Sequence, residues 1–288
     1  MSIKEIHTEE FGHCVLVENN DLQLAVTIDY GPRIVSVTKN GGRNLIYHDN
    51  DPEFNRCHGH KMRLTVDRPS NGVYFDDSPV IYSVLEDGVK FVQTVLEPIQ
   101  LELSLDIMQS NDSSLMIVHS VTNKSKEPLK LSIYTETPLL HDGFVFAPQS
   151  EVEETTRPSR ILTLWNDTRW TDARLHIGDN YIAVTGSDNC SKLKIGMNNT
   201  QGQCMYLNGK NAFVKHYIHN RTALYPFSHC STYFTAHEHF LSIQTSSPFY
   251  LIEPMEIARH IENWSFPDSE TAFGADDEEA MENFTKLL

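Results

Sequence analysis

The chain has 288 residues, of which 40% are hydrophobic, enough to form a sizeable core. Its formal net charge of −16 argues against nucleic acid or an anionic membrane as the main partner, because those ligands are bound by basic patches. No apolar run approaches the length of about 18 residues typical of a membrane span, and no signal-peptide pattern opens the chain. We therefore expect a cytoplasmic monomer or homodimer whose partner is a small molecule.

The cysteines are widely spaced and include no Cys-x-x-Cys pair. An odd number at such spacing is not typical of a disulfide framework, and cytoplasmic proteins keep their thiols reduced. We therefore expect five free thiols, at Cys14, Cys57, Cys190, Cys204 and Cys230.

Alternating apolar residues predict β-strands along most of the chain. In residues 13–47, short β-branched runs are separated by the turn signals Asn19-Asn20, Gly31-Pro32 and Asn40-Gly41-Gly42. Further runs follow at intervals of roughly 8–12 residues, a spacing typical of a β-sandwich or β-barrel. These strands are predicted at 80–85, 89–96, 100–108, 115–123, 129–134, 181–185, 192–197, 204–207, 212–219, 231–239, 241–245, 249–253 and 257–264.

Residues 276–288 carry a helical pattern. Acidic side chains occupy the first turn and Lys286 the last, as the helix macrodipole favours. Met281, Phe284, Leu287 and Leu288 fall on one side of this segment. The pattern predicts a short C-terminal helix that packs on the outside of the domain.

The densest group of ionisable side chains lies between residues 57 and 80. Apolar residues are sparse there, so the segment is predicted to be a long loop rather than a core strand, and long loops in compact domains are usually functional. The side chains concerned are His58, His60, Lys61, Arg63, Asp67, Arg68, Tyr74, Asp76 and Asp77.

Several short motifs occur in an order that resembles the galactose mutarotase-like, or aldose 1-epimerase-like, superfamily. The similarity covers roughly residues 13 to 266 and is strongest to poorly characterised bacterial members. The motifs are Gly31-Pro32-Arg33-Ile34, Gly59-His60-Lys61-Met62, Tyr74-Phe75-Asp76-Asp77-Ser78-Pro79, Trp170-Thr171-Asp172-Ala173-Arg174-Leu175 and His260-Ile261-Glu262-Asn263-Trp264. The resemblance implies an all-β, antiparallel β-supersandwich in a single domain, residues 1–288, whose concave sheet binds a sugar.

The catalytic groups that the family uses are not at their expected positions. Mutarotation needs a carboxylate to take the anomeric proton and an imidazolium to protonate the ring oxygen. The resemblance places Tyr134 where the family has its histidine and Gln244 where it has its glutamate. Glutamine is no general base, and tyrosine, with a pKa near 10, is a poor substitute for the acid unless its surroundings shift that pKa strongly.

Three functions stay open on these residues. The first is a sugar epimerase or mutarotase with a non-standard acid/base pair drawn from His60, Asp76, Tyr134 and Glu136. The second is a carbohydrate-binding protein without catalysis. The third is a lyase or hydrolase acting on an anionic saccharide, because tyrosine and histidine beside cations suit proton abstraction next to a carboxylate.

The remaining site residues are predicted to bind rather than react. Lys61, Arg63 and Lys215 could pair with an anionic sugar, Tyr74 could stack on its ring, and Gln244 could bond a hydroxyl. Because a sugar presents hydroxyl groups in several directions, donors must converge on it from several strands. The single pocket that we predict is therefore lined by His60 or Lys61, Asp76, Tyr134, Lys215 and Gln244.

One histidine pair has the spacing of two metal ligands. His237 and His239 flank Glu238 and share one face of a strand, but no third ligand is visible near them or near Cys57 to His60. Zinc sites require three or four ligands. We therefore expect no metal and no cofactor, and a small-molecule carbohydrate as the partner.

Overall fold

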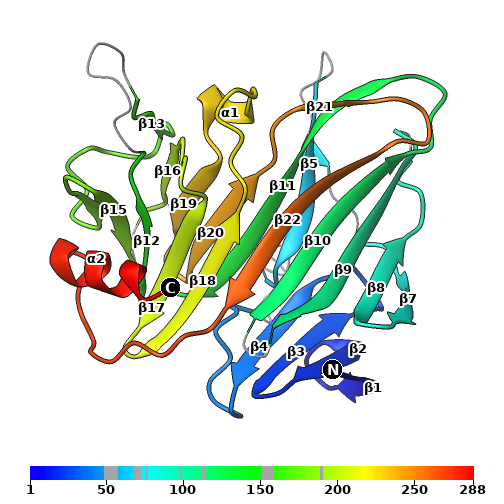
Figure 1. The fold of residues 1–288 in the computed structure, drawn as a ribbon, viewed down its shortest axis with the longest axis horizontal. Coiled ribbons are helices and arrows are strands. Elements are labelled where there is room, and N and C mark those ends of the chain that lie inside the picture. The colour runs from blue at the N-terminus through cyan, green and yellow to red at the C-terminus, as the bar shows by residue number, and fades with distance from the viewer. Residues whose placement is uncertain are drawn as a thin grey trace. The chain divides into compact units, whose positions relative to one another are not determined.

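The computed structural model describes the chain except residues 49–57, 68–72, 75–76, 98, 112–113, 151–158 and 189–190. About 54% of the chain is β-strand and 5% is helix, and the sheets are antiparallel (Figure 1). The predicted all-β, antiparallel class is therefore confirmed. Among the described residues, no helix has the length and apolar character needed to cross a membrane.

The chain divides into two compact units. Unit 1 consists of residues 1–138 and 247–263, and unit 2 of residues 139–246 and 264–288. Each unit has its own buried cluster of hydrophobic side chains. That the two units fold as a single domain stays a prediction.

Three antiparallel arrays of strands form unit 1. The N-terminal sheet has the order β1-β2-β3-β4, a second array has the order β22-β10-β9-β8-β7, and a third has β11-β5-β6 with β21 paired to β11. The strands are β1 (Ser2–Thr8), β2 (Gly12–Asn19), β3 (Leu22–Thr27), β4 (Ile34–Lys39), β5 (Lys61–Val66), β6 (Val73–Tyr74), β7 (Val80–Leu85), β8 (Gly88–Gln93), β9 (Leu101–Asn111), β10 (Ser114–Asn123), β11 (Leu129–Leu140), β21 (Tyr250–Ile252) and β22 (Ile257–Ser265).

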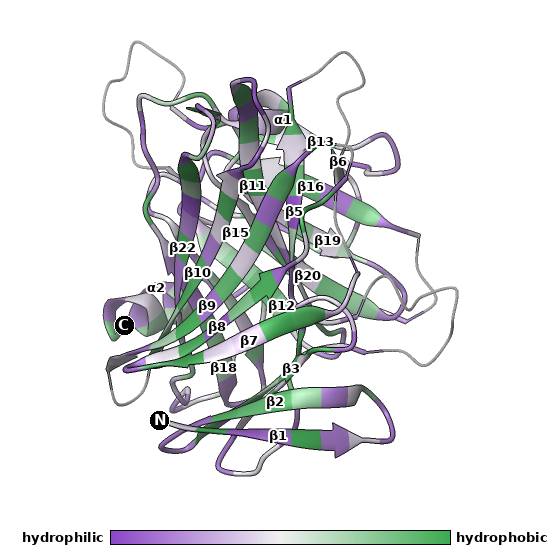
Figure 2. Cartoon of the chain, turned by 90° about the vertical axis from the view of Figure 1, so that its right-hand side faces the viewer, coloured by the Kyte–Doolittle hydropathy of each residue, from purple (hydrophilic) through white to green (hydrophobic). Residues whose placement is uncertain are grey.

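Alternation of side chains explains how these strands pack. Hydrophobic and hydrophilic residues alternate along many strands (Figure 2), because successive side chains point to opposite faces of a sheet. One face of β5 and β11 contributes Leu64, Val66, Leu131 and Ile133 to a buried cluster. Leu103 of β9 and Val121 of β10 belong to the same cluster, so the second and third arrays pack face to face.

One prediction about this region is wrong. Residues 57–80 are not a continuous loop, since Lys61–Val66 form β5, paired with β11. Met62, Leu64 and Val66 form the apolar face of this strand, but they alternate with Lys61, Arg63 and Thr65 in a polar part of the sequence, which conceals the pattern. Its polar side chains are consequently held on a rigid sheet.

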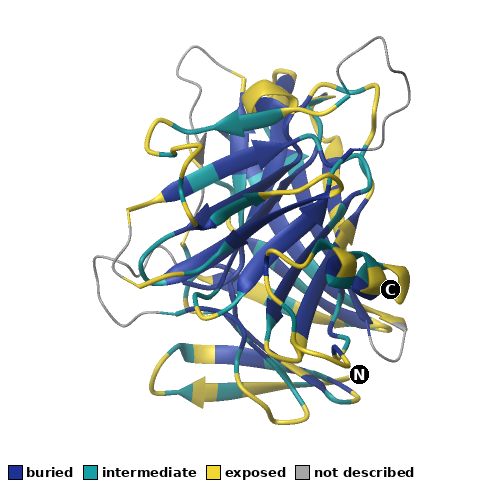
Figure 3. Ribbon diagram, turned by 90° about the vertical axis from the view of Figure 1, so that its left-hand side faces the viewer, coloured by how far each residue is buried: buried dark blue, intermediate teal, exposed yellow. Residues whose placement is uncertain are grey.

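Unit 2 is built from two further arrays, with the orders β14-β15-β12-β17-β18 and β13-β16-β19-β20. The strands are β12 (Phe144–Pro148), β13 (Leu162–Leu164), β14 (Leu175–Ile177), β15 (Tyr181–Thr185), β16 (Leu193–Met197), β17 (Gln203–Asn208), β18 (Asn211–Tyr217), β19 (Thr232–Ala236) and β20 (Phe240–Ser246). A short turn, α1 (Pro226–His229), in which Phe227, Ser228 and His229 have positive φ, precedes β19. Figure 3, in which the left-hand side of Figure 1 faces the viewer, shows that the strands there are largely buried and the turns largely exposed.

The C-terminal helix forms as predicted. Helix α2 (Glu278–Lys286) begins after Asp277, whose carboxylate accepts a hydrogen bond from the backbone amide of Ala280. Met281 and Phe284 are buried against Phe146 and its neighbours in unit 2. Leu287 and Leu288, predicted on the same side, are exposed because the helix ends at Lys286, so the pattern identifies the helix but only part of its buried face.

Candidate functional site

Strands β5 and β11 bring four of the predicted site residues onto one face. In the antiparallel register Lys61 lies opposite Glu136, and Arg63 lies opposite Tyr134. Residues two apart in a strand share a face, and directly opposed residues share it too. Lys61 and Arg63 of the polar segment and Tyr134, which is predicted to occupy the family's histidine position, are thus neighbours in space.

The charges on this face are in contact with one another. A guanidinium nitrogen of Arg63 lies 2.8 Å from Glu136 Oε2, and Lys61 Nζ lies 3.8 Å from the same oxygen. Lys61 is almost completely buried, and Glu136 is only 15% exposed. Tyr134 is 6% exposed. Because burial weakens solvent screening, these ion pairs hold the side chains in place more firmly than surface pairs would.

A small pocket adjoins this face. It is bordered by His60, Lys61 and Met62 and by a buried arginine, Arg33, which donates to Asp77 and to the carbonyl oxygen of His58. Its free volume is about 10 Å³, room for about one water molecule. A pocket of this size does not accommodate a sugar ring, so the face beside it is the better candidate for ligand contact.

His58 is held in the neutral form beside this pocket. Burial, with the charges of Arg33 and Lys61 nearby, lowers the pKa of His58 to about 4. Its Nε2 atom lies 3.2 Å from the hydroxyl oxygen of Tyr30. Gly59 follows with a positive φ of 72°, and a Cβ atom there would lie 3.1 Å from side-chain atoms of Arg33 and Val35. The glycine of the Gly-His-Lys motif therefore permits the turn that places His60.

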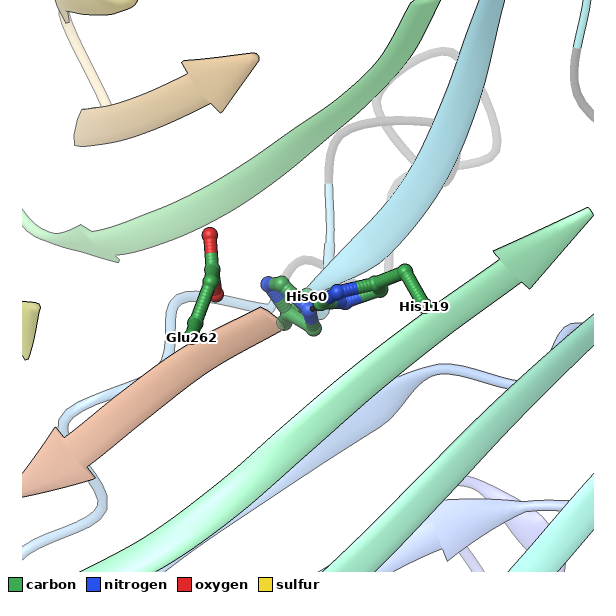
Figure 4. A group of neighbouring side chains, drawn as sticks. All are labelled: His60, His119 and Glu262. Atoms are coloured by element: carbon green, nitrogen blue, oxygen red, sulfur yellow. Dashed lines mark hydrogen bonds between the residues drawn. The ribbon is translucent and has the colours of Figure 1, made fainter. Parts of the chain in front are cut away.

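The side chain of His60 is engaged in a second, fully buried cluster. Its Nδ1 atom lies 2.7 Å from Thr137 Oγ1, and its Nε2 atom lies 2.8 Å from His119 Nε2. Glu262 accepts a hydrogen bond of 2.7 Å from Thr135 Oγ1. Figure 4 shows the side chains of His60, His119 and Glu262 gathered at one point.

Strand β11 separates the two groups of polar residues. Tyr134 and Glu136 alternate with Thr135 and Thr137, so the two pairs point to opposite faces of the sheet. Thr135 and Thr137 contact the buried histidine and glutamate cluster. His60 therefore belongs to the inner cluster rather than to the face that carries Glu136.

Two predicted site residues lie in unit 2. Lys215 of β18 is fully buried, with its Nζ atom 5.2 Å from the ring centre of Trp264. Gln244 of β20 is also buried, and its amide nitrogen donates to the hydroxyl groups of Thr235 and Ser242, each at 3.0 Å. That these two residues share a pocket with the face on β5 and β11 stays a prediction.

The structure does not describe the side chains of two further predicted site residues. Asp76 lies outside the described residues. Tyr74 is described as a backbone position of β6, where it pairs with Leu64 of β5. The predicted roles of both residues stay predictions.

His119 and Glu262 do not stand out in the sequence as a functional pair. They lie far apart in the chain, on β10 and β22, and although Glu262 belongs to the motif His260-Ile261-Glu262-Asn263-Trp264, nothing in either segment relates it to the other. His119 itself carries a sequence signal, because it interrupts an apolar run. A polar side chain that is buried in such a strand needs a hydrogen-bond partner. The alternation of apolar and polar residues does not show which residue that partner is.

Comparison with protein-family models and with curated protein sequences gives no match. Solved structures do match. A galactose mutarotase-like protein from Clostridium acetobutylicum is 12% identical, with a TM-score of 0.58 over 93% of this chain and 99% of that one. A galactose mutarotase-like protein from Lactobacillus casei is 10% identical, with a TM-score of 0.58 over 88% and 99% of the two chains.

The chain has the galactose mutarotase-like fold. A protein of Escherichia coli K12 that is provisionally named an aldose 1-epimerase supports this, with 10% identity and a TM-score of 0.56 over 88% of this chain and 98% of that one. The resemblance found in the sequence motifs is confirmed. At such low identity, the similarity to galactose mutarotase-like proteins shows the fold alone. The chemistry has to be argued from this chain's own side chains.

Proposed function

We propose that the protein binds a carbohydrate on the face of β5 and β11 that carries Lys61, Arg63, Tyr134 and Glu136. The observation that supports this most is the contact of Arg63 and Lys61 with the carboxylate of Glu136, in register beside Tyr134. Charged groups and an aromatic side chain placed together on a rigid sheet supply the donors, acceptors and apolar surface that a sugar needs.

Each of these groups has a distinct role toward a sugar. The guanidinium of Arg63 presents several donors in a plane and suits vicinal hydroxyls or a carboxylate. Lys61 supplies a compact cation. Glu136 accepts from hydroxyl groups, and Tyr134 offers both a ring face and a hydroxyl. The ion pairs orient these groups before the ligand arrives, which lowers the entropic cost of binding.

The chemistry that we propose is ring opening and closure at the anomeric carbon, with Glu136 and Tyr134 as the acid/base pair. Glu136 takes the proton of the anomeric hydroxyl while Tyr134 donates one to the ring oxygen. The bond between C1 and the ring oxygen breaks, and an aldehyde forms. Rotation about the bond from C1 to C2 and return of both protons give the other anomer.

Glu136 and Tyr134 are chosen because they lie together on the proposed face, whereas His60 belongs to the inner cluster and Gln244 lies in unit 2. His60 has both ring nitrogens within hydrogen-bond distance of Thr137 and His119. Gln244 has an amide nitrogen held by two hydroxyls. Glu136 and Tyr134 lie two residues apart on one strand face, roughly 6.6 Å along the chain. Each can therefore reach a different oxygen of one sugar ring.

A second candidate function is proton abstraction from an anionic saccharide, as in a lyase. The position of Arg63 directly opposite Tyr134 favours it, since a cation beside the tyrosine would neutralise a substrate carboxylate. Uronic acids distinguish this function from mutarotation, because only a lyase generates an unsaturated product that absorbs ultraviolet light.

The test uses the full chain and a panel of aldoses, sugar phosphates and uronic acids. Thermal shift reports binding, and NMR exchange spectroscopy follows interconversion of the anomers. Glu136→Gln should leave affinity within about tenfold, roughly 1.4 kcal/mol. The same variant should lower the exchange rate at least about 100-fold, the usual contribution of a general base.

Glu102→Gln is the matched control, because Glu102 pairs with Lys124 in unit 1, away from the candidate face. It should behave as the unaltered protein does in both assays. The absence of a thermal shift with every sugar in the panel would refute carbohydrate binding. Binding without anomeric exchange or an unsaturated product would leave a carbohydrate-binding protein that does not catalyse.

A further inference from the structure

We propose that His60, His119 and Glu262 form a binding site for one divalent transition-metal ion, with Zn²⁺ the best match. The site is separate from the proposed sugar face and does not depend on it. It lies inside unit 1, between the array of β5 and β11 and the array of β10 and β22 (Figure 4).

The first argument is convergence of ligands. One nitrogen each from His60 and His119 and a carboxylate oxygen of Glu262 all lie within 4.8 Å of one another. All three residues are fully buried. Two imidazoles and one carboxylate are a common set of protein ligands at zinc sites that keep a fourth position for water.

The second argument is the orientation of the imidazole rings. His119 Nδ1 lies 3.1 Å from the backbone carbonyl oxygen of His260, which can only accept, so this nitrogen carries the proton. The lone pair of neutral His119 is therefore on Nε2, which is directed at His60. Metal-binding histidines are oriented in the same way, with the other ring nitrogen donating to a carbonyl or hydroxyl group.

His60 can adopt the matching tautomer without moving its ring. Its Nδ1 atom faces the hydroxyl group of Thr137, which can donate or accept. Without a metal, His60 Nε2–H donates to His119. With a metal, the proton resides on Nδ1 and is accepted by Thr137, and both Nε2 lone pairs point at the ion.

Seating the ion requires movement of all three side chains. The two Nε2 atoms are 2.8 Å apart and the ring centres 5.1 Å apart, so the two nitrogens face each other directly. Two nitrogens bound at about 2.05 Å to a tetrahedral zinc ion are about 3.3 Å apart. The rings would therefore separate by about half an ångström and turn until both lone pairs meet at the ion, and the Glu262 oxygen would approach from its present distance of up to 4.8 Å, all by side-chain rotations.

The choice of ion follows from donor type and charge. Nitrogen ligands disfavour Ca²⁺ and Mg²⁺, which prefer oxygen. The carboxylate of Glu262 is buried, with Thr135 donating to it and His260 Nε2 3.8 Å away. A dipositive ion would give this buried carboxylate and both histidine lone pairs one common partner.

The experiment measures metal content and affinity of the full chain. The protein is stripped with a chelator, its fold is checked by circular dichroism, and it is titrated with Co²⁺ and Zn²⁺. We expect one ion per chain, visible d–d absorption of four-coordinate Co²⁺, and a higher melting temperature with Zn²⁺.

Two variants are designed to keep the fold while removing one ligand. In His119→Asn the amide can still donate to the carbonyl of His260, and Glu262→Gln can still accept from Thr135. Each should weaken Zn²⁺ binding at least about 100-fold. His239→Asn, in the histidine pair of unit 2, is the matched control and should bind as the unaltered protein does. A folded protein that binds neither ion, or a His119→Asn variant that binds Zn²⁺ equally well, would overturn the proposal.

Discussion

The Nε2 atoms of His60 and His119 lie 2.8 Å apart, and the Nδ1 atom of each ring lies within 3.1 Å of an oxygen atom. In the metal-free protein this makes a chain of neutral hydrogen bonds from Thr137 through both rings to the carbonyl of His260. Buried polar groups in such a chain depend on one another, since removal of one leaves its neighbours without a partner.

Replacement of His119 by phenylalanine should therefore destabilise the metal-free protein. The aromatic ring fills the space, but His60 Nε2–H and the carbonyl of His260 each lose a hydrogen bond. We expect a loss of about 2–4 kcal/mol in the free energy of unfolding. Urea denaturation in chelator measures it. His216→Phe, at an exposed position of β18, should change stability by less than about 0.5 kcal/mol.

Arg63→Met should reduce sugar affinity by roughly 10- to 100-fold, because charge-assisted hydrogen bonds contribute about 1.5–3 kcal/mol. The loss should be larger for uronic acids and sugar phosphates than for neutral aldoses if the guanidinium binds an anion. Isothermal titration calorimetry gives both values. The exposed Arg169→Met serves as control, and equal affinities in all three proteins would contradict the assignment of Arg63 to the site.

His219 should make stability depend on pH. Its ring stacks on Tyr225 with centres 4.6 Å apart, and burial lowers the pKa of His219 below its ordinary value of 6.5. As the pH falls through 6.5, the unfolded chain takes up a proton that the folded chain does not, so the folded state is progressively destabilised. Urea midpoints at pH 7.5 and 5.5 should differ less in His219→Phe, which keeps the stacking. An unchanged pH dependence would count against this role.

Phe284 offers a test of the single-domain prediction. Its side chain is buried between α2 and the strands of unit 2, so Phe284→Ala should cost about 3–5 kcal/mol. All three tryptophans lie in unit 2, whereas circular dichroism reports both units. If the units unfold together, fluorescence and circular dichroism should give one coincident transition, shifted equally by the substitution. Separate transitions would show two independent domains.

The thiols should be free but slow to react. Burial and the negative charge of Asp29 raise the pKa of Cys14 to about 11, and burial raises that of Cys230 to about 11. Because the thiolate is the reactive form, both residues should react slowly with a thiol reagent in the folded protein. In denaturant without reductant, all five cysteines should react, and three or fewer would indicate disulfides.

Local patterns predict much of this fold because strand and helix periods act over a few residues. The alternation along β11 and the charge distribution of α2 lie entirely within short segments. Strand β5 is hard to predict because the alternation of Met62, Leu64 and Val66 is short and is flanked by polar residues on both sides. The polar residues of this segment therefore indicate a functional site but make strand β5, which carries them, difficult to predict.

The inner cluster could not be predicted in this way. His60 and His119 are 59 residues apart in sequence, and Thr135 and Glu262 are 127 apart. Their meeting depends on how two strand arrays pack, which no local period encodes. The sequence points to His60 as chemically important, but the partner of its ring is a property of the tertiary structure.

The long separations around His60 also bear on the order of folding. Contacts between distant residues form only after large loops have closed, and proteins rich in such contacts fold slowly. Strands β5, β10, β11 and β22 must all have met before His60, His119 and Glu262 can lie together. An ion bound by these three residues would thus be captured late, at a point when most of unit 1 is already assembled, and would slow its unfolding.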